Sequence, residues 1–86
     1  MIRRFGWALT QAIKKHGFTP KQLDVNAKHE VGKIYWCGYW QKTYKVVSIN
    51  EKDIVNHVTV EWDDLTTSTH CTKLDVYRDW LLIPAT

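Results

Sequence analysis

The residues of this sequence best suited to contacting another molecule lie near its start, where a tryptophan stands among cations. At about 100° per residue, Trp7 shares one side of an expected helix with Gln11 and four Lys or Arg residues. A tryptophan exposed among cations offers a stacking surface and a cation–π partner beside charges that neutralise phosphate, and Trp and Arg also anchor many protein interfaces. A third interpretation is that Trp7 folds back onto the protein and the cations are only solvated. This candidate surface for a nucleic acid or an acidic partner comprises Arg3, Arg4, Trp7, Gln11, Lys14 and Lys15.

A second candidate surface is aromatic, because four of the six residues from Tyr35 to Trp40 carry rings. Neighbouring side chains of a strand point to opposite faces, so some of these rings would enter the core and the rest would line a groove. The alternative is that all of them serve the core of a small protein, in which each buried ring removes roughly 150–250 Å² from water. The partner-binding residues expected here are Tyr35, Trp36, Tyr39, Trp40 and Tyr44.

Metal binding and catalysis have weak support in the residue pattern. Tetrahedral zinc sites use close pairs of ligands, whereas among the two cysteines and four histidines only His70 and Cys71 are adjacent, and strand neighbours point to opposite faces. Cys37 lies in an aromatic strand, where a lone cysteine is more often a packed hydrophobe than a nucleophile. Asp63 and Asp64 stand in an expected turn, a place that favours Asp for local hydrogen bonds. We expect no catalytic residue, no metal and no cofactor, and hence a protein that is not an enzyme.

Composition places these candidate surfaces on one small domain. The 86 residues, 44% of them apolar and 24% charged, fit a single soluble globular domain. No apolar run approaches the ~18 residues of a membrane span, and the N-terminus lacks the apolar segment of a signal peptide. Two cysteines are too few for a disulfide scaffold. We expect a cytoplasmic protein with reduced thiols and no membrane contact.

Charge is divided unevenly along the chain. Residues 1–33 carry seven Lys or Arg and two acidic residues, a balance of +5, whereas residues 34–86 carry five and seven, a balance of −2. A basic segment on a neutral or acidic body indicates contact with a nucleic acid, contact with an acidic protein, or a contribution to solubility alone.

A helix is predicted from near Arg3 to His16. Phe5, Leu9 and Ile13 fall on one side of it, which we expect to pack against the rest of the protein or against a partner. Gly17 is the residue expected just beyond its end, because glycine readily adopts the left-handed conformation that closes many helices.

A second, short helix is predicted from about Pro20. In the segment Thr19-Pro20-Lys21-Gln22, a capping residue is followed by a proline suited to the first helical position and by a glutamine suited to a capping box. Two helices joined by a glycine turn also fit a helix-turn-helix DNA-binding unit, although the apolar spacing fades after Leu23 and no third helix follows.

From Val31 onward the apolar period changes from 3.6 to 2, which indicates β-strands. In the second strand the apolar set shifts from Tyr44 and Val46 to Val47 and Ile49, so a bulge or a two-sided strand is expected there. Five short strands are predicted, at about residues 33–36, 43–49, 58–62, 66–72 and 80–83.

Four stretches of the chain carry a resemblance to a known class of fold: residues 31–35 (VGKIY), 44–46 (YKV), 58–64 (VTVEWDD) and 82–84 (LIP). Together they resemble the SH3-like, Tudor-like class of small β-barrels, over roughly residues 31–86. The resemblance implies a five-stranded antiparallel barrel in which the region near residues 35–40 holds a ligand, either a proline-rich peptide or a modified side chain in an aromatic cage. Small proteins of phages and mobile elements often use this barrel, so the resemblance is also compatible with such an origin.

These patterns predict a basic helical segment, residues 1–30, in front of a small barrel, residues 31–86, in one compact unit. The function expected is that of a non-catalytic protein-interaction module, a small adaptor or inhibitor that uses the aromatic groove and the basic helix face. The alternative is a nucleic-acid-binding protein that contacts phosphates through the N-terminal helix. Exposed sheet edges and the apolar side of the helix also favour a homodimer.

Overall fold

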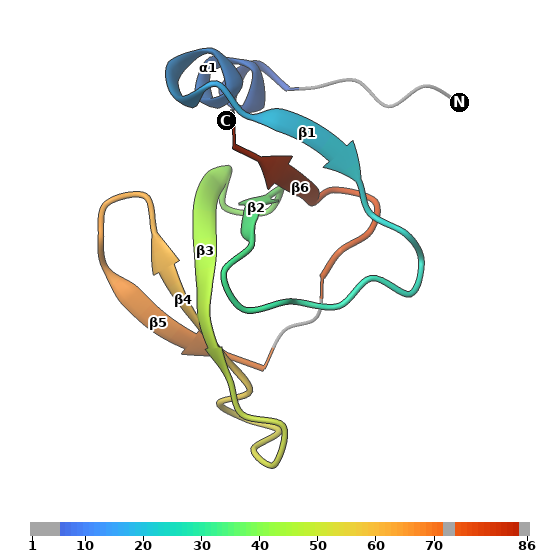
Figure 1. The fold of residues 1–86 in the computed structure, drawn as a ribbon, viewed down its shortest axis with the longest axis vertical. Helices are drawn as coiled ribbons and strands as arrows, with labels where there is room; N and C mark the ends of the chain where they lie inside the picture. Colours follow the sequence, from blue (N-terminus) through green and yellow to red (C-terminus); the bar gives the residue numbers. More distant parts are fainter. Residues whose placement is uncertain (1–5, 72–73, 85–86) are drawn as a thin grey trace.

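The described part of the chain folds into one helix and six antiparallel strands and is therefore mainly β (Figure 1). The structure is a computed structural model and describes residues 6–71 and 74–84. In chain order the elements are α1 (Trp7–His16), β1 (Thr19–Gln22), β2 (Ile34–Cys37), β3 (Lys42–Ile49), β4 (Val58–Trp62), β5 (Thr67–His70) and β6 (Trp80–Ile83).

The helix α1 ends where the sequence predicts. Gly17 follows it with a φ of 71°, in the left-handed region, and donates its N–H to the carbonyl of Ile13. Leu9 and Ile13, on the apolar side of α1, pack against the sheet. The expected start near Arg3, with Phe5 on the apolar side, lies outside the described residues.

The prediction of a second helix from about Pro20 is wrong, because residues 19–22 form β1. Thr19 lies opposite Ile83 and Gln22 lies opposite Trp80, so β1 pairs along its whole length with β6. A single helical turn gains little stability alone, whereas pairing with β6 satisfies backbone groups of both strands. The missing N–H of Pro20 is tolerated because β1 is an edge strand. The strand excludes the helix-turn-helix, and it makes the number of strands six rather than five.

The six strands form a sheet in the order β1-β6-β2-β3-β4-β5. The strands β2 to β5 follow one another as neighbours, and β6 returns from the end of the chain to lie between β1 and β2. The strands predicted at residues 58–62 and 80–83 are confirmed without change, and the other three match β2, β3 and β5 within a few residues. Of the two alternatives predicted for this strand, a bulge or a two-sided strand, the structure favours the bulge, because the register shifts between Val46 and Ser48 where β3 pairs with β4.

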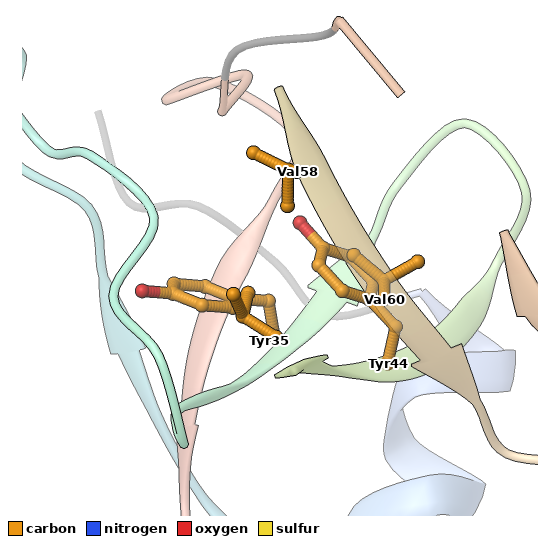
Figure 2. Close-up of a cluster of buried hydrophobic side chains, with 5 residues drawn as sticks. Tyr35, Tyr44, Val58 and Val60 are labelled. Carbon is orange, nitrogen blue, oxygen red and sulfur yellow. The ribbon is translucent and has the colours of Figure 1, made fainter. Parts of the chain in front are cut away.

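Two clusters of buried side chains lie on the two faces of β2, whose neighbours Tyr35 and Trp36 point in opposite directions. Tyr35 stacks on Tyr44 with ring centroids 5.6 Å apart, and Figure 2 shows both rings beside Val58 and Val60. Buried Val46 completes this first cluster. The second cluster lies under α1 and comprises Leu9, Trp36, Trp80 and Leu82.

The N-terminal segment is part of the sheet rather than an appendage to it. Its strand β1 pairs with β6, and α1 covers the second cluster, so residues 6–22 share both hydrogen bonds and core contacts with the remainder. No helix in residues 6–71 or 74–84 is long and apolar enough to cross a membrane.

Candidate functional site

A hollow of about 470 Å³ opens on the face of the sheet that carries the first cluster. Its base is formed by the buried side chains of Tyr44, Val58 and Val60, on β3 and β4. Aromatic rings from the turn between β2 and β3 and from the end of β4 line its sides, together with polar side chains from β5 and from the turn before β6. The hollow therefore combines an apolar base with polar groups at its margin, as small-molecule and peptide sites commonly do.

Two of the lining rings are largely open to solvent. Trp40 is 61% exposed and Tyr39 is 67% exposed, and their rings meet edge to face with centroids 5.0 Å apart. The guanidinium carbon of Arg78 lies 5.8 Å from the centroid of the Tyr39 ring, within the range of a cation–π contact. Large rings held at the margin of a concave apolar surface are the residues that a partner would cover.

The structure divides the five residues expected to bind a partner. Tyr39, Trp40 and Tyr44 line the hollow. Tyr35 is 1% exposed and Trp36 is 6% exposed, and each belongs to one of the two core clusters. Both faces of β2 are covered, one by the first cluster and the other by α1, so the side chains of Tyr35 and Trp36 do not reach the surface.

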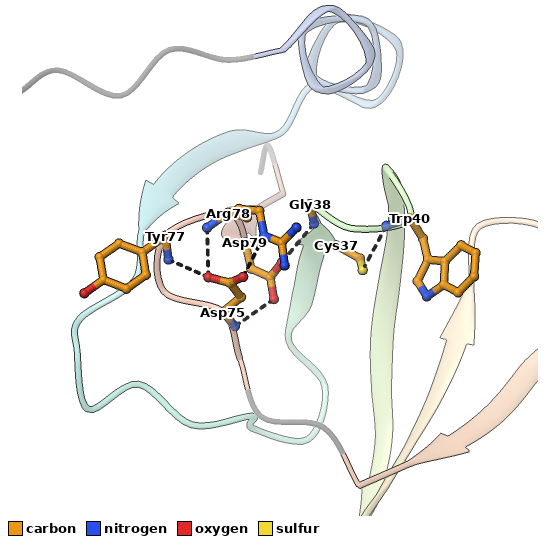
Figure 3. Close-up of polar contacts among 7 residues, drawn as sticks. All are labelled: Cys37, Gly38, Trp40, Asp75, Tyr77, Arg78 and Asp79. Carbon is orange, nitrogen blue, oxygen red and sulfur yellow. Dashed lines mark hydrogen bonds and ion pairs between the residues drawn. The ribbon is translucent and has the colours of Figure 1, made fainter.

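The turn that carries Tyr39 and Trp40 is held in place by a buried carboxylate (Figure 3). Asp79 accepts a hydrogen bond from the N–H of Gly38 at 2.8 Å and another from the N–H of Asp75 at 3.0 Å. Burial raises the pKa of Asp79, and the two N–H donors oppose that rise. Through these two bonds the end of β2 is attached to the turn that precedes β6.

Gly38 is required at this attachment for steric reasons. A Cβ atom at position 38 would lie 2.5 Å from the carbonyl oxygen of Arg78 and 2.6 Å from its Cβ. The backbone of the turn therefore approaches the Arg78 backbone as closely as only glycine allows. Cys37 adds a weaker contact, because its Sγ accepts the N–H of Trp40 at 3.5 Å.

An ion pair completes this side of the hollow. Arg78 donates from Nε to Oδ2 of Asp75 at 2.7 Å, and this bond lowers the pKa of the Asp75 carboxyl. Asp75 also accepts the backbone N–H of Tyr77 at 3.0 Å. With one cation and two acidic groups, this side of the hollow does not carry the positive charge that a phosphate requires.

The opposite side is a chain of hydrogen bonds from Trp62 through Ser68 to His70. The indole N–H of Trp62 donates to Oγ of Ser68 at 2.7 Å, and the same Oγ lies 2.7 Å from Nε2 of His70. An indole only donates, so the Ser68 oxygen accepts from Trp62, and the tautomer of His70 decides whether Ser68 donates to Nε2 of His70 or accepts from it. The rings of Trp62 and His70 are thereby fixed edge to face, with centroids 5.9 Å apart.

His29 borders the base of the hollow from the segment before β2. Its Nε2 lies 2.8 Å from the hydroxyl of Tyr44, and its ring packs edge to face on Tyr35 with centroids 5.2 Å apart. Burial, together with smaller electrostatic contributions from His57 and His70, lowers the pKa of His29 to about 4. His29 is therefore neutral at pH 7. Burial raises the pKa of the Tyr44 hydroxyl, which stays protonated.

The basic surface expected on the first helix is described only in part. Trp7 is 79% exposed, and Gln11, Lys14 and Lys15 are exposed on α1, whereas Arg3 and Arg4 lie outside the described residues. Trp7 also borders a second hollow of about 560 Å³, together with Tyr77 and Arg78. The indole does not fold back into the core.

Several lining residues were not expected from the sequence. These residues come from positions far along the chain from residues 35–40, and strand pairing brings them together: Trp62, His70, Asp75, Arg78 and Asp79. The alternation of apolar residues in β4 was the available signal for Trp62, because it places Trp62 on the same face as Val58 and Val60. Among the described residues, no three His, Cys, Asp or Glu side chains are grouped as ligands of a metal ion, and Cys37 and Cys71 are free thiols.

Comparison of this chain with models of protein families, with curated proteins and with solved structures finds no match. The functional argument therefore rests on the hollow and on the surfaces beside it.

Proposed function

We propose that this protein is a non-catalytic interaction module that binds an extended segment of a partner protein in the aromatic hollow. The observation that carries the proposal is the pair of exposed rings, Tyr39 and Trp40, at the margin of an apolar hollow, on a turn that the buried carboxylate of Asp79 anchors at Gly38. Exposing large rings is unfavourable in water unless a partner covers them. The hydrogen bonds that hold the backbone of this turn reduce the conformational entropy lost on binding.

A protein partner fits the charges of the site better than a nucleic acid does. The hollow places Asp75 and Asp79 beside Arg78, and residues 34–86 carry a balance of −2. An apolar or cationic side chain would enter such a hollow without the repulsion that a phosphate would meet.

We further propose that β2 to β6 form a small rolled sheet of the SH3-like class. The order β6-β2-β3-β4-β5 supports this, because the last strand returns to pair with the first of a meander. The hollow would then lie on the inner face of this roll, because it opens over the first cluster. The fold class does not determine the ligand, which is argued from the site.

The test is a selection of short random peptides displayed against the purified protein. Peptides that bind the hollow should lose about thirtyfold in affinity on Trp40→Ala, the effect of losing an interface anchor worth about 2 kcal/mol. Trp7→Ala is the matched control, because Trp7 is also an exposed tryptophan but lies on α1. Peptides that bind wild type and Trp40→Ala equally, or a selection that enriches none, would refute the proposal.

A second candidate function is nucleic-acid binding by α1, favoured by the exposed Trp7 and by Lys14 and Lys15 on the same helix. Stacking of a base on Trp7 together with phosphate contacts from the lysines predicts affinity for single-stranded DNA that falls with salt, by roughly 0.7 in the log–log slope for each phosphate contact. A fluorescent oligonucleotide titrated at several salt concentrations tests this. A flat salt dependence, or equal binding by the double variant Lys14→Glu/Lys15→Glu, removes the candidate.

A further inference from the structure

The strand β5 leaves one row of backbone hydrogen-bonding groups open. It is the last strand of the sheet and pairs only with β4 among the described strands. The N–H of Trp62 donates to the carbonyl of Thr66, so Trp62 and Thr66 are a hydrogen-bonded pair. Such pairs recur every second residue in an antiparallel ladder.

The register then assigns the direction of each backbone group in β5. Val60 with Ser68, and Val58 with His70, are the next hydrogen-bonded pairs. The N–H and C=O groups of the alternate residues, Thr67 and Thr69, therefore point away from β4. Figure 1 shows β5 at the outer margin of the sheet, on the far side of β4 from β3.

The two edges of the sheet differ in their protection. The edge strand β1 contains Pro20, which has no N–H, and Lys21, whose charge opposes strand addition. The four residues of β5 are Thr, Ser, Thr and His, with neither proline nor lysine. The register of β5 against β4 is regular, and the register shift among the described strands lies between β3 and β4. The edge at β5 is thus open to a further strand.

The side chains of β5 connect this edge to the hollow. Residues directly opposite each other in a sheet share a face, so Ser68 and His70 lie on the face of Val60 and Val58, and His70 lines the hollow. A strand placed beside β5 would continue this face, and its residues opposite Ser68 and His70 would point toward the hollow. The hairpin turn beside the start of β5 carries the exposed carboxylates of Asp63 and Asp64.

We infer that the partner segment binds as an additional strand on β5, with its backbone paired to Thr67 and Thr69 and its alternate side chains directed toward the aromatic hollow. The segment is four to six residues long, as the length of β5 requires, apolar at alternate positions, and basic at the end beside Asp63 and Asp64. This inference rests on the proposed function, because it assigns the way in which the partner of the same site is bound.

The experiment uses a library of short random peptides, selected in parallel on wild type and on Trp40→Ala. Amide hydrogen exchange of wild type is then followed by NMR with and without each enriched peptide. We expect bound peptide to slow exchange of the Thr67 and Thr69 amides at least about tenfold and to leave the inward-facing amides of Ser68 and His70 little changed. Thr69→Pro, which removes one outward N–H, should weaken binding by at least about tenfold, and the matched control Thr69→Val should not.

The outcomes separate the two proposals. Peptides that require Trp40 but leave the Thr67 and Thr69 amides unchanged overturn strand addition and leave the proposed function standing. Peptides that protect both amides and bind Trp40→Ala as well as wild type support strand addition and refute the proposal that the partner binds in the hollow. Protection of these amides that rises with protein concentration in the absence of peptide identifies a second copy of this chain as the occupant, and it overturns the assignment to a partner. A selection that enriches no peptide on either protein also overturns that assignment. If Thr69→Pro does not fold, the exchange measurement on wild type still decides.

Discussion

Replacing His29 with glutamine should remove much of the loss of stability that the protein undergoes between pH 6.5 and pH 4. In the folded protein, burial lowers the pKa of His29 to about 4, whereas the unfolded chain titrates near 6.5. Between these two values the unfolded state binds more protons than the folded state, so the free energy of unfolding rises with pH. The contribution of His29 is complete above pH 6.5 and is lost as the pH falls to about 4.

The size of this contribution follows from the same two pKa values. At about 1.4 kcal/mol per pH unit, the interval from 6.5 to about 4 sets an upper limit of about 3 kcal/mol. His29 is only partly buried, and water that reaches the ring screens the effect, so about 1–2 kcal/mol is expected. In urea, with a slope of about 1 kcal/mol per molar for a chain of this size, the midpoint of wild type should fall by about 1–2 M.

The assay is urea unfolding at half-unit steps from pH 4 to pH 8, followed by tryptophan fluorescence, for wild type and His29→Gln. Glutamine retains a group able to hydrogen bond Tyr44 but does not titrate, so the pH dependence rather than the absolute stability is compared. His16→Gln, on the exposed end of α1, is the control. Parallel stability curves of wild type and His29→Gln between pH 4 and 6.5 would show that the pKa of His29 is the same in the folded and the unfolded chain. That result would refute the reasoning.

The remaining predictions concern the support of the hollow. Gly38→Ala should destabilise the protein by about 1–3 kcal/mol, because the added Cβ would overlap the backbone of Arg78. Gly6→Ala, whose added Cβ meets nothing within 4 Å, should cost less than about 1 kcal/mol, the effect of a poorer N-cap on α1, and urea unfolding compares the two variants. Asp79→Ala should lower the free energy of unfolding by about 2–4 kcal/mol, because the N–H groups of Gly38 and Asp75 each lose their acceptor. Asp79→Asn, which keeps one acceptor oxygen, should be milder, and equal effects of the two variants would contradict this. Trp7→Ala should change the free energy of unfolding by less than about 0.5 kcal/mol, as followed by thermal unfolding, because the indole of Trp7 is exposed.

The sequence predicts those elements whose pattern is local. The end of α1 at Gly17 and the strands β2 to β6 follow from apolar periods and from turn residues within a few positions. The hairpin at Asp63-Asp64 has this character too, with Leu65 at a φ of 70° closing a three-residue loop. Periodicity is sufficient there because the two strands are neighbours in the chain.

β1 could not be predicted in the same way, because its pairing partner lies about sixty positions later in the chain. Within residues 19–22, the capping pattern around Pro20 is a valid local signal for a helix. The ladder with β6 overrides it, and the local sequence carries no trace of that partner. Propensity is a weak predictor wherever a distant strand supplies the hydrogen bonds.

The candidate site likewise has a part that the local sequence indicates and a part that depends on distant elements. The density of rings near Trp40 indicated an aromatic surface, but alternation within β2 left open which rings face outward. Tyr35 and Trp36 are both buried because α1 covers the face of β2 that would otherwise meet solvent. The polar margin of the hollow, at His70 and at Asp79, exists only after β5 and β6 have paired.

The edges of the sheet explain what the N-terminal segment contributes to the fold. Without β1, the strand β6 would be an edge, and its Leu81 and Leu82 would lie on a strand ready to pair with another chain. β1 covers that edge and ends the sheet with Pro20 and Lys21 instead. One edge of the sheet thus carries its own protection against strand addition, and the strand addition that we propose is left to β5, the edge that adjoins the hollow.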